Sequence, residues 1–154
     1  MTFQPIDPAI LTSTAGLDLL RGIVAGNYPQ PPIADLLGFR LVHVEAGRAE
    51  FAGTPDHRHY NPLGTVHGGY AATLLDSCMA CAVHSTLAAG QGYTTIEFKV
   101  TLVRPMTTAT GEVRAIGEII NVGRRVGASH GRLVDAQGKV LAHGTTSCLI
   151  FAAD

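Results

Sequence analysis

The sequence has little charge, and positive and negative charges nearly balance. Only 15% of the 154 residues are Asp, Glu, Lys or Arg, and the formal net charge is −1 at pH 7. Without an excess of positive charge, the chain has no global attraction to nucleic acid or to an anionic membrane, so any anion site must be a local cluster. Its length and its 46% of hydrophobic residues are typical of one compact globular domain.

Cysteines and long apolar runs are also scarce. Cys78, Cys81 and Cys148 are odd in number and lack framework spacing, which argues against disulfides and favours a reducing, cytoplasmic compartment. No apolar run reaches the length that spans a membrane, and the first residues show neither a basic leader nor a hydrophobic signal core. No zinc-binding spacing of Cys and His occurs. We therefore expect a cytoplasmic protein that binds neither membrane nor metal.

The longest gap in charge lies in the middle of the chain. Between residues 59 and 96, Asp76 is the only charged side chain. It lies in the apolar stretch "GTVHGGYAATLLDSCMACAVHSTL", which has hardly any polar face. This stretch predicts one long helix over about 66–88, ended by Gly90 or Gly92, and buried on nearly all sides.

The segments around this helix have other periods. "TAGLDLLRGIVAG" predicts an amphipathic helix that closes near Gly26, followed by a proline-rich connector with one or two helical turns. "FRLVHVEAGRAEFAGTP" predicts a hairpin with strands near 39–45 and 48–54. After the long helix, the sequence alternates in period two through "TTIEFKVTLVR", "GEVRAIGEIIN", "RRVGASHGRLVD" and "KVLAHGTTSCLIF", with a turn at "DAQGK".

Two strands, a buried helix and four long antiparallel strands predict an α+β domain. A curved antiparallel sheet wrapped around one long central helix would bury that helix as its composition demands. We expect residues 1–38 to form an N-terminal helix and connector packed on a domain that spans 39–154.

Asp76 needs an explanation, because burying an unpaired carboxylate is costly. A structural acid would be held by a cation or a loop amide. However, no Lys or Arg is near it in sequence, and it lies more than two turns from the helix start, beyond the reach of the helix dipole. A chemical role is therefore favoured, since removal from water makes a carboxylate a better base and nucleophile.

The "HGG" at 67–69 is the second candidate feature. Two glycines in the first turn of a helix cost stability relative to alanine. They are useful where a ligand must approach the backbone, because the free N–H groups of a helix start form an anion or oxyanion site. Close packing of the helix would explain the glycines equally well, and both readings stay open.

The helix cysteines do not suggest a metal or redox site. His84 is turned about 120° from Cys81 around the helix and lies well away from Cys78. A redox CxxC motif belongs at a helix start rather than in its middle. Small buried core cysteines are the favoured interpretation.

Two polar pairs in loops and turns carry weaker signals. His57 and His59 alternate in a loop without acidic or cysteine companions, and we expect both to be solvated. Arg124 and Arg125 are adjacent at a strand start, where they could bind phosphate, although such charges are more often simply solvated.

Taken together, "NPLGTVHGGYAATLLDSCMACA" resembles the signature of hotdog-fold acyl-CoA thioesterases of the phenylacetic-acid-degradation type. In that pattern an asparagine precedes His-Gly-Gly by six residues, and an acid follows the histidine by nine. Asn61, His67 and Asp76 match this spacing. "TTIEFKVTLVRP" resembles the next strand of the family, whose start carries a Ser or Thr near the active site. Thr95 fits that place best and Thr94 is the alternative.

The resemblance implies roles for five residues. Asp76 matches the carboxylate that attacks the thioester carbonyl or activates water for that attack. The Gly68 amide matches the oxyanion donor at the helix start, Asn61 the side chain that binds the carbonyl or water, and His67 a supporting residue. Thr95 completes the predicted catalytic set.

Substrate contacts are implied more loosely. Gly69, Arg124 and Arg125 match positions that contact the CoA moiety of the substrate. Some relatives carry a Thr one turn after the acid, but here that residue is Ala80. No metal or redox cofactor is implied, because CoA is part of the substrate and the carboxylate and backbone donors suffice for hydrolysis.

The resemblance favours hydrolysis of an acyl-CoA thioester to acid and free CoA. A sensor that binds acyl-CoA on the same fold is the alternative, but a sensor has no need for a costly buried base. A dehydratase acting on acyl thioesters would place its His and acid in a different arrangement. Neither the acyl group nor the choice between nucleophilic and general-base catalysis follows from the sequence.

Helix geometry adds a prediction about assembly. Gly68 and Asp76 are eight residues apart, which places their backbones about 12 Å from each other along one helix. Both groups must act on one carbonyl, so we expect a homodimer with two shared sites. Asn61 and Gly68 would come from one chain, and Asp76 and Thr95 from its partner. A homotetramer built as a dimer of dimers is the expected larger assembly.

Overall fold

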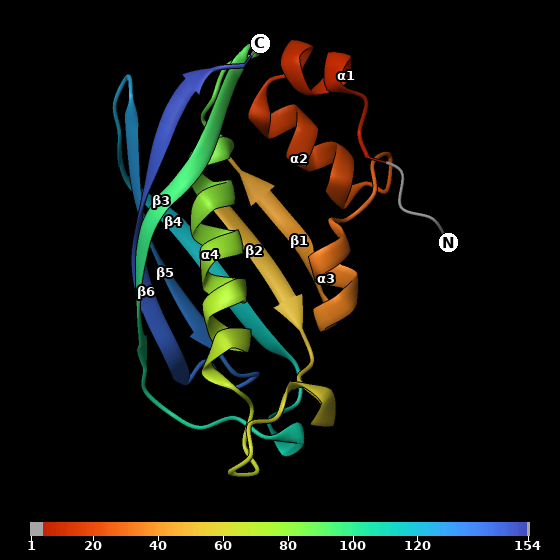
Figure 1. Cartoon of the computed structure of the whole chain (residues 1–154), viewed down its shortest axis with the longest axis vertical. Coiled ribbons are helices and arrows are strands. Elements are labelled where there is room, and N and C mark those ends of the chain that lie inside the picture. The colour runs from red at the N-terminus through yellow and green to blue at the C-terminus, as the bar shows by residue number, and fades with distance from the viewer. Residues whose placement is uncertain (1–4, 154) are drawn as a thin grey trace.

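The computed structural model describes residues 5–153. A six-stranded antiparallel sheet curls around the long helix α4, Gly68–His84, in the strand order β1-β2-β4-β5-β6-β3 (Figure 1). The strands are β1 Phe39–Glu45, β2 Arg48–Gly53, β3 Gln91–Leu102, β4 Val113–Val122, β5 Val126–Val134 and β6 Val140–Ala152. The other helices are α1 Pro8–Ser13, α2 Gly16–Val24 and α3 Pro32–Leu37, with short 3-10 turns η1 His57–His59 and η2 Thr108–Thr110. The predicted α+β architecture is confirmed.

Turn chemistry fixes both predicted hairpins. Gly47 joins β1 to β2 with φ of 80°, a left-handed conformation that glycine adopts without a steric penalty. In the turn between β5 and β6, the Asp135 carboxylate accepts hydrogen bonds from the Gln137 and Lys139 N–H groups, each at 2.9 Å. These local bonds set the register in which the strands pair.

Glycines in the sheet let α4 approach closely. A Cβ on Gly117 of β4 would overlap the carbonyl oxygen of Cys78, and one on Gly127 of β5 would lie 2.5 Å from a methyl group of Val83. Ser129 of β5 donates a hydrogen bond of 2.8 Å to the carbonyl oxygen of Met79. The sheet therefore touches the helix backbone itself and not only its side chains.

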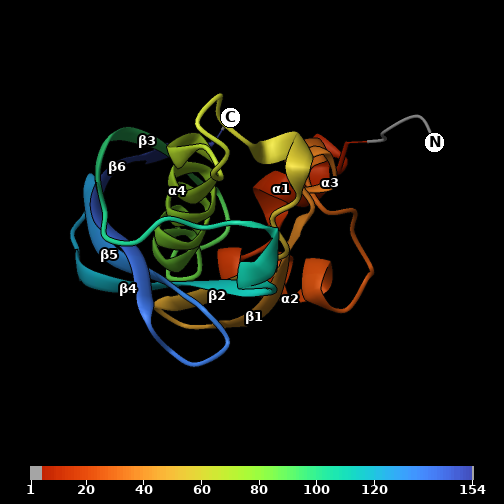
Figure 2. The ribbon, with the colours of Figure 1, turned by 90° about the horizontal axis from the view of Figure 1, so that it is seen from below.

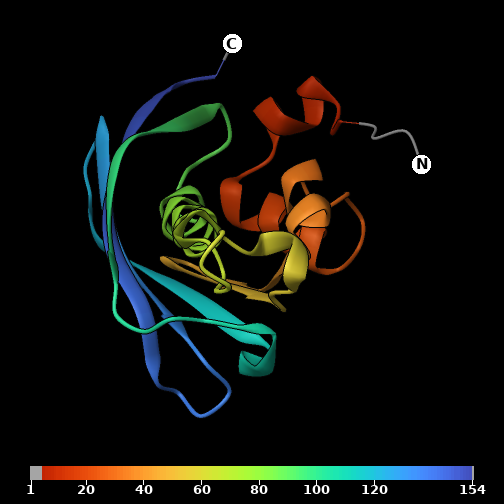
Figure 3. The ribbon, with the colours of Figure 1, turned by 60° about the horizontal axis from the view of Figure 1, so that its bottom comes forward.

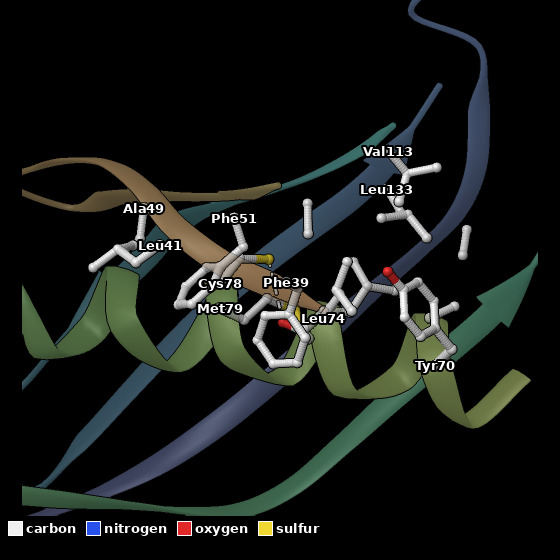
Figure 4. Packing of buried hydrophobic residues seen from close by; sticks show 14 of the residues in the cluster. Phe39, Leu41, Ala49, Phe51, Tyr70, Leu74, Cys78, Met79, Val113 and Leu133 are labelled. Atoms are coloured by element: carbon white, nitrogen blue, oxygen red, sulfur yellow. Dashed lines mark hydrogen bonds between the residues drawn. The ribbon is translucent and has the colours of Figure 1, made fainter. Parts of the chain in front are cut away.

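The main core lies between this helix and the concave face of the sheet. Its members from the helix and the sheet share near-complete burial, and Figure 4 shows several of them interlocked: Phe39, Leu41, Ala49, Phe51, Tyr70, Leu74, Cys78, Met79, Val113 and Leu133. Burial of these apolar surfaces is the principal stabilising contribution expected for such a domain.

The long helix is shorter than the predicted 66–88. It begins at Gly68, because His67 is extended and caps the helix by accepting the Gly69 N–H at its Nδ1. It ends at His84, because the Ser85 hydroxyl donates to the Ala82 carbonyl and accepts the N–H of Gly47 at 2.8 Å. Both ends are thus set by polar contacts that an apolar pattern does not reveal.

The helix is also less enclosed than its composition predicts. Thr73, Asp76, Ser77, Cys81 and His84 form a half-exposed stripe along one side of α4. Figures 2 and 3 show the sheet curled around α4, with the N-terminal helices on the other side of this helix. Asp76 and Cys81 of the stripe line a cleft together with Tyr93 of β3 and Pro31 of the N-terminal segment.

The N-terminal segment packs against β1 and the C-terminal end of α4. The Gly16 N–H donates to the Leu87 carbonyl at 3.0 Å, and a Cβ on Gly16 would overlap the His84 carbonyl oxygen. Gln30 in the connector is bound to β1, accepting from the Leu41 N–H at 3.0 Å. Within residues 5–153, no helix combines the length and apolarity needed to cross a bilayer.

Candidate active site

Asp76 and Thr95 meet in the open stripe of α4. The Thr95 hydroxyl, on β3, donates a hydrogen bond of 3.0 Å to Oδ1 of Asp76. Thr94 is exposed, so Thr95 is the one of the two candidates that contacts Asp76. A β-bulge follows at once, between Thr95 and Glu97. Bulges often occur next to active sites, where they redirect side chains.

Asp76 has no cation to neutralise it among the residues that the structure describes. It lines a cleft of about 510 Å³ whose walls include Phe51, Cys81, Tyr93 and Thr95. The purely structural reading, in which an ion pair holds this acid, therefore finds no support here.

The groups around the carboxylate are neutral. Burial raises the pKa of Cys81 to about 12, with a smaller contribution from the nearby Asp76 charge. Burial likewise raises the pKa of Tyr93 well above its usual value, and that of the Cys148 thiol. The thiols are therefore protonated and poor nucleophiles at neutral pH. Asp76 is the one charged group lining this cleft within residues 5–153.

The start of α4 offers a backbone donor. Among residues 5–153, no atom accepts a hydrogen bond from the Gly68 N–H, whereas the Gly69 N–H is bound to the His67 ring at 2.8 Å. Close packing also explains both glycines, since a Cβ on Gly68 would lie 2.7 Å from Leu102 and one on Gly69 2.9 Å from His67. The two readings of the HGG motif are thus compatible.

Asn61 lies beside Gly68 and is held by its own loop. Its Oδ1 accepts from the N–H groups of Leu63 at 2.9 Å and Thr65 at 3.3 Å, and its Nδ2 donates to the Thr65 hydroxyl at 3.0 Å. The second N–H of Nδ2 has no acceptor within the described part of the chain. Asn61 and Gly68 together line a cleft of about 290 Å³, bordered by Leu102.

The structure does not bring all the predicted residues together within one chain. Asp76 and Thr95 line one cleft, and Asn61 and Gly68 line another. Arg124 and Arg125 are exposed at a third place, between β4 and β5. The predicted set therefore divides into two half-sites and a separate basic pair.

The burial of His59 was not predicted from the sequence, because both loop histidines were expected to be solvated. His57 is exposed, but His59 is only 6% exposed. Its carbonyl accepts the His67 N–H at 2.7 Å, its Nδ1 accepts the Asp56 N–H at 2.9 Å, and its ring lies 4.6 Å from that of Tyr70. His59 thereby fixes the backbone that leads into α4. The one sequence signal was its place two residues before Asn61.

Possible metal sites are also limited. Within residues 5–153, no three or more His, Cys, Asp and Glu side chains gather in a way that could hold a metal ion. The three cysteines are free, with Cys78 and Cys148 buried and Cys81 half-buried. This agrees with the interpretation of Cys78 as a small core residue.

Comparison with known proteins relates this geometry to a family. The thioesterase superfamily model matches residues 63–142. A Halobacterium salinarum protein described as a candidate esterase is 34% identical over 99 residues, which cover 59% of this chain and 64% of that protein, just under two thirds of its length.

Solved structures agree. A Ralstonia eutropha protein described as a thioesterase-like, phenylacetic acid degradation-related protein has a TM-score of 0.76 at 29% identity, over 84% of this chain and 98% of that one. A mutant of the phenylacetic acid degradation protein PaaI of Thermus thermophilus has a TM-score of 0.70 at 28% identity, over 77% and 98%. The Escherichia coli PaaI protein, at 20% identity, shares the fold with a TM-score of 0.78 over 89% and 96%.

The family model covers the helix that carries Gly68 and Asp76 and the strand that carries Thr95. It begins after the N-terminal helices and after Asn61. The chain therefore belongs to the thioesterase superfamily, a family of thioester hydrolases, and has the hotdog fold of its PaaI-type members.

Proposed function

We propose that this protein hydrolyses an acyl thioester of coenzyme A to the free acid and CoA. The observation that carries the proposal is Asp76, a carboxylate with no cationic partner in the described chain, oriented by Thr95 in a cleft with otherwise neutral walls. A carboxylate so placed is free to act as base or nucleophile.

Two routes use the same residues. In one, Asp76 takes a proton from a water molecule as the water oxygen attacks the thioester carbonyl. In the other, the carboxylate attacks directly, and water then hydrolyses the resulting mixed anhydride. In both, the C–S bond breaks and CoA leaves as a thiolate that takes up a proton. The negative charge that develops on the carbonyl oxygen is stabilised by the Gly68 N–H and the free N–H of Asn61.

Each active site is proposed to need two chains. The oxyanion donor and the base lie about 12 Å apart along one helix, in separate clefts. Two antiparallel copies of α4 can offer the start of one helix to the middle of the other.

The edge strand β3 supports this homodimer. It ends the sheet, and Ile96, Phe98 and Leu102 on it are 56%, 44% and 58% exposed. A long apolar edge strand left uncovered is an aggregation hazard. A second copy of the chain laid along β3 would cover it.

A larger assembly and contacts with the CoA moiety are also proposed. Exposed apolar side chains of β4, among them Ile119 and Ile120, could join two dimers into a tetramer. Arg124 and Arg125 would bind phosphates of the CoA moiety as charged, flexible donors, with Gly69 near the same moiety. His67 supports the site by capping α4. No cofactor takes part, and the free thiols fit a cytoplasmic location.

Release of free thiol tests the proposal. A panel of acyl-CoA esters, followed with a thiol reagent, should give CoA with the wild-type protein. Asp76→Asn, nearly isosteric, should lose more than about 90% of kcat, because an amide is neither base nor nucleophile. Its folding should be kept, since no ion pair is lost.

The controls separate the alternatives. Binding of the same esters, measured by calorimetry, without CoA release from any of them would identify a sensor instead. A variant Asp76→Asn that keeps more than a tenth of wild-type kcat would remove the catalytic assignment.

A further inference from the structure

A second cavity lies next to the Asp76 cleft, on the side of the N-terminal segment. It has a volume of about 370 Å³ and shares four lining residues with the cleft, Pro31, Phe51, Cys81 and Tyr93. The two spaces therefore adjoin at these residues. The volume lies in the range of small-ligand pockets, about 300–1,000 Å³.

The far walls of this cavity come from segments outside the region that the superfamily model matches. Leu11 of α1, Leu20 and Ile23 of α2 and Leu41 of β1 contribute apolar side chains. Figure 3 shows these helices on the side of α4 away from β6. The N-terminal segment thus adds a pocket to the shared fold.

No charged side chain lines this cavity within residues 5–153. Both polar groups of Gln30 are taken up by Leu41, whose N–H donates to Oε1 at 3.0 Å and whose carbonyl accepts from Nε2 at 3.3 Å. Burial lowers the pKa of His84, so its ring is neutral at pH 7, and Tyr93 is neutral too. A charged group placed here would lose its water without gaining a partner, which is costly.

The direction of the cavity fits a chain that starts at the reacting carbonyl. Asp76, Cys81 and His84 follow one another along the open side of α4, and Cys81 and His84 line the cavity. From Asp76 to His84 the helix rises about 12 Å. An acyl chain with its carbonyl at Asp76 would therefore extend toward α2.

We propose that this cavity is the acyl pocket, and that the N-terminal segment selects CoA thioesters of uncharged, hydrophobic acyl groups long enough to enter it. The proposal rests on the proposed thioesterase function. It adds the substrate class and gives α1, α2 and the connector a role in specificity.

Octanoyl-CoA and octanedioyl-CoA form a matched pair of probes, because they differ only in a carboxylate that replaces the terminal methyl group. The wild-type protein should prefer octanoyl-CoA in kcat/KM by roughly 100-fold or more, since the carboxylate must be desolvated without a partner. Acetyl-CoA, too short to reach the pocket, should show a lower kcat/KM than octanoyl-CoA.

Ile23→Lys places a cation in the pocket and should reduce the preference for octanoyl-CoA by about tenfold or more. Val24→Lys, the next residue of α2 and 40% exposed outside the pocket, is the matched control and should leave the preference within about twofold.

A binding titration separates this inference from the function on which it rests. With Asp76→Asn, which should turn the ligands over at least about tenfold more slowly than the wild type, octanoyl-CoA should bind more tightly than octanedioyl-CoA by a similar factor. Preferential binding without any hydrolysis by the wild type would leave the pocket standing and remove the thioesterase. Hydrolysis of both probes with equal kcat/KM would support the thioesterase and overturn the acyl pocket. This comparison uses the wild-type protein, so it does not depend on the folding of Ile23→Lys. Equal effects of Ile23→Lys and Val24→Lys would also overturn the inference.

Discussion

At the scale of single residues, the hydrogen bond between Thr95 and Asp76 decides how the carboxylate is presented. The hydroxyl occupies Oδ1 at 3.0 Å, which leaves Oδ2 for a water molecule or a carbonyl carbon. In the proposed reaction Thr95 would act through the orientation of Asp76, and its removal should affect turnover more than binding.

Thr95→Val, which keeps the shape of the side chain but removes the donor, should lower kcat by roughly tenfold, about the effect of one hydrogen bond. KM should change little. Steady-state kinetics on one acyl-CoA ester would measure both. Thr95→Ser should restore most of kcat, and a serine variant as slow as the valine variant would indicate that the threonine matters only for packing.

At the scale of elements, glycines of the sheet determine how closely α4 packs against the strands. Gly117 lets the Cys78 carbonyl approach β4, and Gly127 makes room for Val83. Hydrogen bonds of Ser129 and Ser85 also hold the helix in this position, which we call its seating. The position of Asp76 relative to β3, and so its contact with Thr95, depends on this seating.

Gly117→Ala should therefore destabilise the protein strongly, by roughly 3 kcal/mol, because the added methyl group meets helix backbone that cannot rotate away. Urea denaturation would measure the loss as a lower midpoint. Gly123→Ala is the control, since its Cβ would lie 3.5 Å from the nearest atom, and its free energy of unfolding should change by less than about 0.5 kcal/mol. Equal stability of the two variants would contradict close seating of the helix.

At the scale of the whole molecule, the proposed mechanism requires a second chain, because the two half-sites line separate clefts. Complementation between two inactive variants tests the shared sites. The two substitutions are chosen to change the shape and contacts of the side chains as little as the structure allows. Asn61→Asp keeps an oxygen for the Leu63 and Thr65 N–H groups but loses the donor, and Asp76→Asn loses the base. Each variant alone should be inactive.

Co-expressed with two different tags, these variants should regain about a quarter of wild-type activity. Random pairing makes half of the dimers mixed, and each mixed dimer has one intact site out of two. Purification on both tags in series should raise the recovery to about one half, because only mixed dimers remain. Doubly tagged dimers with no activity would show that each site forms within one chain.

The sequence by itself determined the strands, the central helix and the isolation of the Asp76 carboxylate within it. Alternation with period two predicted the later strands, turn residues between two short strands predicted the hairpin, and a long apolar run predicted the central helix. The isolation of Asp76 was equally visible, since charge is a local property of the chain. The separation of Gly68 from Asp76 followed from helix rise alone.

Only the tertiary structure decided where the helix ends, which side of it stays open and what lies beside Asp76. Ser85 ends α4 through a contact with Gly47, 38 residues away, and no local pattern encodes such a partner. The burial of His59, the contact of Thr95 with Asp76 and the position of the N-terminal segment beside the Asp76 cleft have the same origin. Each depends on segments that are distant in the sequence and become neighbours only when the sheet closes around the helix.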